Sequence, residues 1–294
     1  MSSKKNSDNM KALIRSLKDK DVILFVGAGV SMGVGAPSWS KLMNFVAKDC
    51  KIEPEIFHEL GDNYSLAEYH RISQNDSNGK RLRKILTREL HRTESKTKVA
   101  ESEVHKILTQ LPINVIYTTN YDHYLEWAFK NAGVDIHKIT KASDVGKVSS
   151  ATRQIVKFHG DLCDDSKLVF SETDYFERLS FETALDIKLR SDLLNKSVLF
   201  IGYSFSDFNV RLMFHKLNQL YREANSDGPS KNSHDSFFFL TSPNIVRETN
   251  LNRIGVKTIV SDAANPGEAL LAFLRELHQA VNQPMESTSS RPKR

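Results

Sequence analysis

The sequence contains very little cysteine. Only Cys50 and Cys163 occur among its 294 residues. Two cysteines are too few for the disulfide framework of a small secreted protein, and too few for a zinc site built from four thiolates.

Long apolar runs are absent as well. Segments such as Val22–Val26 and Phe237–Leu240 are far shorter than the roughly 20 residues that a membrane-spanning helix needs. The first residues, MSSKKNSDNMK, lack the apolar core of a signal peptide. We therefore expect a soluble, cytoplasmic protein that does not contact a membrane.

The excess of one charge sign is small and unevenly distributed. The net charge is +5, of which residues 1–20 carry +4, residues 80–98 carry +6 and residues 283–294 carry +2, so that the rest of the chain sums to −7. Basic patches on an acidic body do not indicate a nucleic-acid-binding protein, although the pI is near 9.0. The basic stretch Lys80–Arg92 also contains no aromatic residue on which a base could stack. Direct nucleic-acid binding is therefore not expected.

What is present is the composition of one ordinary globular domain, with 39% hydrophobic residues. The polar ends predict a flexible N-terminus at 1–9 and a flexible basic tail at 283–294, which leaves 10–282 as the folded domain. Short runs that are apolar almost throughout predict strands buried on both faces. These runs are Asp21–Val26, Asn114–Thr118, Gln154–His159, Ser197–Ile201, Ser236–Leu240 and Val256–Val260.

Helical patterns alternate with these strands, at Trp39–Cys50, Tyr121–Ala132 and Phe208–Ala224. Alternation of this kind predicts an α/β fold with a doubly wound, mainly parallel sheet. Residues 39–111 contain no convincing strand, so we expect them to form an inserted helical lobe.

The helix predicted at Lys80–Arg92 is strongly amphipathic. Its apolar face comprises Leu82, Ile85, Leu86 and Leu90, and basic residues occupy most of the other positions of the helix. The helix is either a solvated surface over a packed stripe or a surface that contacts a partner.

A glycine-rich turn, Gly27–Pro37, follows the first predicted strand. Such a turn lets the backbone approach a pyrophosphate and direct N–H groups at it. Its spacing is GxGxxxG, which differs from the usual dinucleotide-binding GxGxxG. The alternative is a glycine-rich turn that binds no ligand.

Polar residues follow three further strands. Asn120 and Asp122 are placed to orient a hydroxyl or an amide, or to cap the next helix. His159 is suited to act as a general base, or it is structural. The segment Gly202–Asp207 is suited to receive ribose or phosphate, or it is a turn with a helix cap. Because parallel strands end at one edge of a sheet, the four clusters are expected to converge there.

In this order, GAGVSMGVGAPSW, TTNYD, FHGDL and GYSFSD resemble the motifs of the sirtuin superfamily, and in particular its zinc-free bacterial branch of anti-phage NAD hydrolases. The resemblance covers about residues 20–265 and implies a Rossmann-like NAD-binding domain. It assigns catalysis to His159 and Asn120. It assigns NAD contacts to Gly27, Ala28, Gly29, Ser31, Asp122, Gly202, Ser204 and Asn244.

Two departures separate this sequence from the sirtuin deacylases. The paired CxxC motifs of their zinc module are missing, because only Cys163 lies between His159 and Gly202. Ser38-Trp39-Ser40 replaces their Asp-Phe-Arg, whereas Leu168–Glu177 resembles the zinc-free branch. We therefore expect no metal and no zinc, with NAD+ as a substrate that is hydrolysed.

The resemblance also implies regulation, because uncontrolled NAD hydrolysis would poison the cell. It implies a homo-oligomer, or an activating partner such as a HerA-type ATPase or a short Argonaute. Protein deacylation, transfer of ADP-ribose to a macromolecule, and non-catalytic sensing of NAD or ADP-ribose remain as alternatives.

Overall fold

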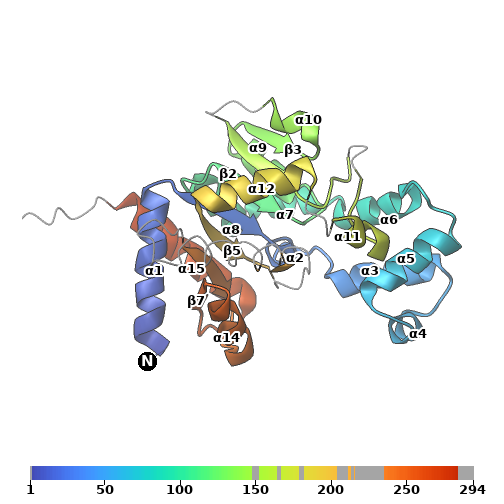
Figure 1. Ribbon diagram of the computed structural model, residues 1–294, viewed down its shortest axis with the longest axis horizontal. Coiled ribbons are helices and arrows are strands. Elements are labelled where there is room, and N and C mark those ends of the chain that lie inside the picture. Colours follow the sequence, from blue (N-terminus) through green and yellow to red (C-terminus); the bar gives the residue numbers. More distant parts are fainter. Residues whose placement is uncertain are drawn as a thin grey trace, which may run out of the picture.

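A seven-stranded parallel sheet forms the centre of the protein, in the order β3-β4-β2-β1-β5-β6-β7. The computed structural model describes residues 2–147, 152–163, 167–178, 182–203, 211–212, 215 and 235–283. The strands are β1 (Val22–Val26), β2 (Val115–Thr118), β3 (Ile136–Ile139), β4 (Arg153–Lys157), β5 (Ser197–Ile201), β6 (Ser236–Leu240) and β7 (Val256–Val260). The sheet is thus parallel and wound on both faces, as the sequence predicts (Figure 1).

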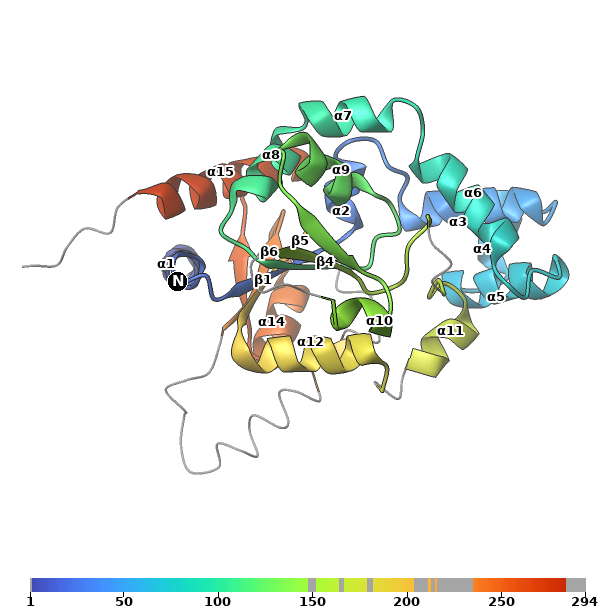
Figure 2. The ribbon, with the colours of Figure 1, turned by 90° about the horizontal axis from the view of Figure 1, so that it is seen from above.

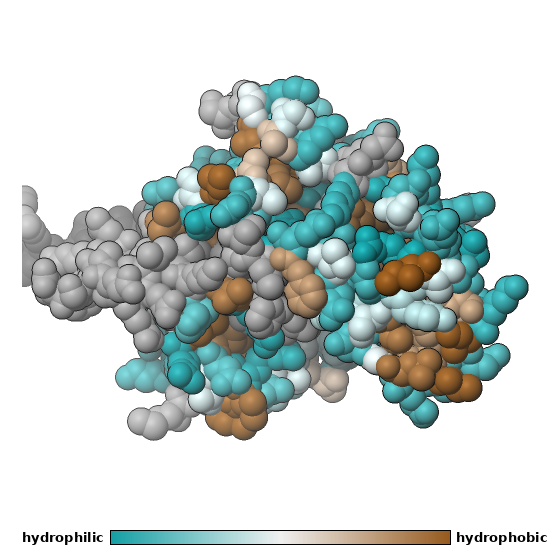
Figure 3. Space-filling model, turned by 45° about the vertical axis from the view of Figure 1, so that its right-hand side comes forward, coloured by the Kyte–Doolittle hydropathy of each residue, from teal (hydrophilic) through white to brown (hydrophobic). Residues whose placement is uncertain are grey.

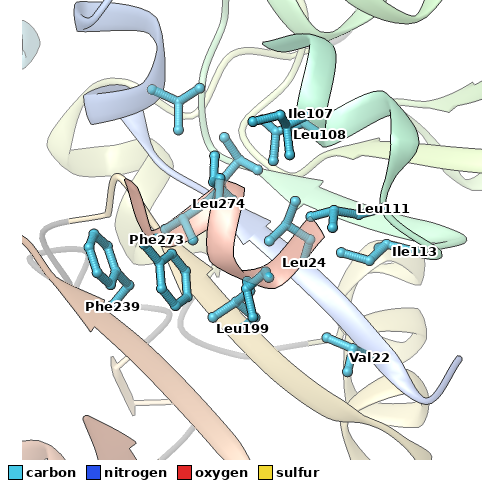
Figure 4. Packing of buried hydrophobic residues seen from close by; sticks show 14 of the residues in the cluster. Val22, Leu24, Ile107, Leu108, Leu111, Ile113, Leu199, Phe239, Phe273 and Leu274 are labelled. Carbon is cyan, nitrogen blue, oxygen red and sulfur yellow. The ribbon is translucent and has the colours of Figure 1, made fainter. Parts of the chain in front are cut away.

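Helices cover both faces of this sheet (Figure 2). One face carries α1 (Ser2–Lys18), α8 (Glu103–Gln110), α9 (Tyr124–Asn131) and α15 (Pro266–Asn282); the other carries α10 (Ala142–Val145), α12 (Ala184–Asn195) and α14 (Ile245–Arg253). Successive residues of β1 alternate between the two layers. Leu24 packs with Leu199, Phe273 and Leu274 (Figure 4), whereas Phe25 packs in the opposite layer. A central strand buried on both faces must be apolar at every position.

A lobe of short helices extends from one end of the sheet (Figure 1). It contains α3 (Trp39–Asp49), α4 (Pro54–Glu59), α5 (Asn63–Ser73) and α6 (Lys80–Leu90), with α11 (Glu172–Glu177) packed on α5. A separate apolar cluster, including Leu42, Phe57 and Leu86, holds the lobe together. The next helices, α7 (Ser95–Glu101) and α8, pack instead against α9 and α15. The lobe therefore ends before residue 111, because the last part of the predicted insertion covers the sheet.

The amphipathic helix α6 buries the predicted apolar face, Leu82, Ile85, Leu86 and Leu90. Several arginines on α6 or just after it pair within the chain. Arg81 Nε lies 2.6 Å from Asp49 Oδ2. Arg88 and Arg92 both contact Glu89, at 2.7 and 2.9 Å. These contacts favour the interpretation of α6 as a solvated surface over a packed stripe.

Large apolar side chains are exposed elsewhere on the lobe, where brown surface gathers in Figure 3. On α4 and the turn after it, Ile56 and Leu60 are exposed; on α5, Tyr69 and Ile72 are exposed. Among the described helices, none combines the length and the apolar character needed to cross a bilayer.

Most of the predicted strands agree with the observed ones to within a residue or two, and those at 197–201, 236–240 and 256–260 agree at both ends. The sequence prediction missed β3, whose residues Ile136–Ile139 include His137 and Lys138 and form a partly exposed edge strand. The predicted helix at Phe208–Ala224 and the predicted tail at 283–294 lie almost entirely outside the described residues.

The prediction that residues 1–9 form a flexible tail is wrong for the described part, because this segment belongs to α1. Asn6 Nδ2 donates to the carbonyl of Val260 at 3.1 Å, and Asn6 Oδ1 accepts from the N–H of Val260 at 2.8 Å. The buried Asn9 Nδ2 donates to the carbonyl of Thr258 at 2.9 Å. These side chains thus occupy backbone groups of the edge strand β7.

Candidate functional site

The glycine-rich turn after β1 packs directly on the turn after β5. A Cβ atom on Gly27 would lie 2.4 Å from the carbonyl oxygen of Gly202, and one on Gly29 would lie 2.8 Å from it. Gly202 itself has φ of +56°, and a Cβ there would lie 2.6 Å from the nitrogen of Val30. The three glycines are therefore required because two backbone segments touch each other.

This contact corrects one detail of the predicted phosphate loop. The N–H of Gly27 donates to the carbonyl of Ile201 at 3.0 Å, and the N–H of Gly29 donates to the carbonyl of Gly202 at 2.7 Å. These two N–H groups join the turn after β1 to the end of β5 and to the residue after it, so they are not directed at a pyrophosphate. The short helix α2 (Ala28–Met32) begins at this point.

Ser31 and Asn120 meet across the ends of β1 and β2. Asn120 Nδ2 donates to Ser31 Oγ at 3.2 Å, and the N–H of Asn120 donates to Thr118 Oγ1 at 3.0 Å. Both side chains are buried. The bonds fix the orientation of the Asn120 amide, so its role is not that of a helix cap.

Asp122 caps the next helix, which is one of the two functions that its sequence context suggests. Its Oδ1 accepts from the N–H of Tyr124 at 3.1 Å, which caps the first turn of α9. Its backbone carbonyl accepts from Nζ of the fully buried Lys157, which also lies 3.4 Å from Glu126 Oε1. The lysine charge thus holds the segment after β2 against β4.

His159 lies at the end of β4 and is only 3% exposed. Its ring meets that of Tyr175 from α11 edge-on, with centroids 5.4 Å apart, and stacks near Phe158 at 5.9 Å. The N–H of Val169 donates to its carbonyl at 3.0 Å. The histidine therefore sits between the sheet and the helical lobe.

A cavity of about 900 Å³ joins these groups at the carboxyl ends of the strands. Predicted site residues that line it are Ala28, Gly29, Ser31, Asn120, Asp122, His159 and Gly202. This edge of an open parallel sheet is where ligands of such folds bind. The volume is large enough for a ligand of dinucleotide size.

Three predicted residues stand apart from this group. Gly27 lies behind the lining. Asn244 is the exposed N-cap of α14, where its Oδ1 accepts from the N–H of Arg247 at 2.9 Å, and it does not line the cavity. Ser204 lies outside the described residues.

Aromatic residues of the lobe complete the cavity, and the sequence interpretation gave them no role. Trp39, Tyr64 and Tyr175 line it. The ring of Trp39 lies 4.6 Å from that of Phe170, and the ring of Tyr64 lies 4.4 Å from that of Tyr175. Their signals were Ser38-Trp39-Ser40 and Leu168–Glu177, which mark departures from deacylases but do not reveal which side chains face inward.

A fully buried carboxylate lies beside the site. Asp161 Oδ1 accepts from His123 Nε2 at 2.6 Å, and Oδ2 accepts from Lys138 Nζ at 2.8 Å. Burial acts to raise the pKa of Asp161, but these bonds and the nearby charge of Lys157 outweigh it and hold that pKa far below its usual value. Burial, followed by the neighbouring His123, lowers the pKa of His91 to about 4.

Comparison with known proteins shows which families and proteins this chain is similar to. The family model described as SIR2-like domain matches residues 114–259. The protein named NAD(+) hydrolase ThsA from Bacillus cereus (strain MSX-D12) is 33% identical over 72% of this chain, and the match covers 43% of that protein. The chain thus spans less than half the length of this relative.

Two other relatives are also similar to this chain over most of its length. NAD(+) hydrolase ThsA of Acinetobacter baumannii (strain 532279) is 28% identical over 92% of this chain and 56% of its own length. Defense-associated sirtuin 2 of Bacillus subtilis is 26% identical over 82% of this chain and 23% of its own. A solved Sir2 homologue in complex with NAD is 13% identical, with a TM-score of 0.43 over 92% of this chain and 94% of that one.

Proposed function

We propose that this chain, a SIR2-like domain, hydrolyses NAD+ to nicotinamide and ADP-ribose. One observation carries the proposal: Ser31, Asn120 and His159 line a single cavity at the sheet edge. It is supported by the relatives named NAD(+) hydrolase, which match most of this chain.

The chemistry demands little acid catalysis. Nicotinamide leaves from a cationic nitrogen, and the ribose passes through an oxocarbenium-like transition state. The site must therefore hold the ribose, exclude bulk solvent and deliver one water molecule. The largely buried cavity lining around Asn120 and His159 is suited to these tasks.

In this proposal each predicted side chain has one task. His159 accepts the proton of the attacking water, and Asn120, oriented by Ser31, positions that water or the ribose. Asp122 holds the carboxamide of nicotinamide. Ala28, Gly29 and Gly202 line the wall for the ribose and the pyrophosphate.

NAD+ is the substrate, and no further cofactor enters the reaction. We also propose that the protein is cytoplasmic and acts in anti-phage defence, where NAD depletion stops the infected cell. A homo-oligomer, or a partner such as a HerA-type ATPase or a short Argonaute, would control it. The relative named Defense-associated sirtuin 2 supports the defence role.

The test measures nicotinamide and ADP-ribose by mass spectrometry in purified protein under activating conditions, with size-exclusion chromatography of the same sample. His159→Ala and Asn120→Ala should each lower turnover about 100-fold or more. His278→Ala on α15, which does not line the cavity, should behave as wild type. Wild-type turnover in both site variants would refute these roles.

The products separate the alternatives. O-acetyl-ADP-ribose formed with an acetylated peptide would indicate deacylation, and ADP-ribose attached to a macromolecule would indicate transfer. Tight nucleotide binding with no product under any condition would indicate a sensor.

A further inference from the structure

Three side chains with soft or borderline ligand atoms meet beside the cavity. His91 ends α6, His123 precedes α9, and Cys163 follows β4. Each offers one nitrogen or sulfur atom, and these atoms lie within 4.8 Å of one another. The three residues come from segments far apart in the chain, so the fold itself assembles the cluster.

The distances between ligand atoms in the cluster suit an ion with tetrahedral coordination. Cys163 Sγ lies 3.5 Å from His123 Nδ1. With Zn–S of about 2.3 Å and Zn–N of about 2.0–2.1 Å, a tetrahedral angle places the two ligand atoms about 3.6 Å apart. The ring centroids of His91 and His123 are 4.7 Å apart. Little movement would be needed to bring the ligand atoms around one ion.

A carboxylate already orients the central ligand. Asp161 accepts from His123 Nε2 at 2.6 Å, which leaves Nδ1, the atom facing Cys163, available as a ligand. A histidine that binds a metal through one nitrogen commonly donates its other N–H to a carboxylate. The same carboxylate accepts from the backbone N–H of Cys163 at 2.7 Å. Asp161 thus positions two of the three ligands.

His91 offers a nitrogen lone pair. Its Nε2 accepts from the backbone N–H of His123 at 3.1 Å, so this nitrogen carries no proton, and an ion bound there would take the place of that N–H. Its ring is partly buried, whereas Cys163 is exposed. An ion can therefore reach the cluster from solvent, and water can fill a fourth position.

A second grouping around His123, with Glu126 and Asp161, is less suitable. Both oxygens of Asp161 are engaged, by His123, by Cys163 and by Lys138. Lys157 Nζ lies 3.4 Å from Glu126 Oε1 and competes with a cation there. A thiolate with two imidazoles is the donor set that favours zinc over calcium or magnesium.

We propose that His91, His123 and Cys163 bind one Zn²⁺ ion, with Asp161 as the carboxylate that positions His123. The expectation from the sequence that the protein binds no zinc rested on the missing CxxC pairs, and this site does not use them. The ion would tie the segment that carries Asn120 and Asp122 to the segment that follows His159. Zinc binding is independent of the proposed NAD hydrolysis.

The test uses the full chain, freed of metal and titrated with Zn²⁺ and with Co²⁺ alone. We expect one ion per chain, and absorption bands of cobalt bound to thiolate in tetrahedral geometry. Cys163→Ser should remove the thiolate band, and His91→Ala and His123→Ala should each weaken binding. Asp161→Asn should weaken binding about 10–100-fold while the thiolate band remains.

Cys50→Ser is the matched control. Cys50 is the other cysteine, and its Sγ lies 3.9 Å from Ser73 Oγ in the lobe. This variant should bind Co²⁺ as wild type does, and Zn²⁺ should raise its melting temperature but not that of Cys163→Ser. A cobalt spectrum without a thiolate band, or equal affinity in Cys163→Ser and wild type, would overturn the proposal whether or not the protein hydrolyses NAD+.

Discussion

Only glycine fits at position 202, for two structural reasons. Its φ of +56° lies in the left-handed region, and its Cα touches the turn that contains Gly29 and Val30. Side chains are disfavoured by this φ and excluded by this contact. The junction between β1 and β5 therefore depends on this one position.

We expect Gly202→Ala to lower the free energy of unfolding by about 2–5 kcal/mol, since left-handed strain of about 1–2 kcal/mol adds to overpacking of about 1–3 kcal/mol. Gly133→Ala is the matched control, because Gly133 has φ of +66° but open space around a Cβ. It should cost only the left-handed strain of about 1–2 kcal/mol. Urea unfolding of both variants measures the difference, and equal losses would show that the contact with Val30 is unimportant.

At the scale of residues, the sequence was sufficient to select side chains that share one cavity but not to explain how they are packed. Asn120 and His159 were chosen from their positions after apolar strands, and both line the cavity. The close packing that requires Gly27 and Gly29 was not predicted, since the partner that excludes a side chain, Gly202, is distant in sequence. Trp39 and Tyr175 were missed because the direction of a side chain depends on packing of the lobe.

Helix α1 protects the exposed edge of β7. An edge strand presents unpaired N–H and C=O groups, and proteins commonly cover them. Asn6 pairs with both backbone groups of Val260, as a neighbouring strand would. The helix thus closes the sheet at this side with side-chain amides.

Replacement of both Asn6 and Asn9 by alanine should lower the free energy of unfolding by about 1–3 kcal/mol, because hydrogen bonds to the edge strand are lost. Asp8→Ala, at an exposed position on the same helix, should have little effect. Chemical denaturation of the three proteins checks this expectation. A double variant as stable as Asp8→Ala would contradict the role given to α1.

Elements that are buried on both faces were predictable, and elements that rely on distant partners were not. β5 and β6 are apolar after their first residues, Ser197 and Ser236, and their predicted bounds agree with the structure. β3 was missed because only Ile139 among its four residues is buried. The start of α1 was missed because Asn6 and Asn9, which join this helix to β7, are polar. Polar residues at the end of the chain suggested a flexible tail.

The whole molecule should lose stability as the solution becomes mildly acidic. Burial lowers the pKa of His105 to about 4, and His105 is 1% exposed. Between that value and the usual 6.5 or so, the unfolded chain binds a proton that the folded chain does not. The contribution of His105 is therefore complete above pH 6.5 and declines as the pH falls towards 4.

At pH 5 this histidine alone should cost about 2 kcal/mol relative to pH 7. His105→Gln removes the titrating group and should reduce the pH dependence by about that amount. Urea unfolding of both proteins at pH 7 and pH 5 measures it. An unchanged pH dependence in the variant would show that His105 is not the group responsible.

The junction between β1 and β5 also determines when the cavity can exist. β1 ends at residue 26, whereas β5 begins at residue 197 and Gly202 follows it. Since domains fold as their segments leave the ribosome, a nascent or prematurely terminated chain that stops before Gly202 lacks one wall of the site. If the protein consumes NAD+ as proposed, unfinished copies would be harmless to the cell that synthesises them.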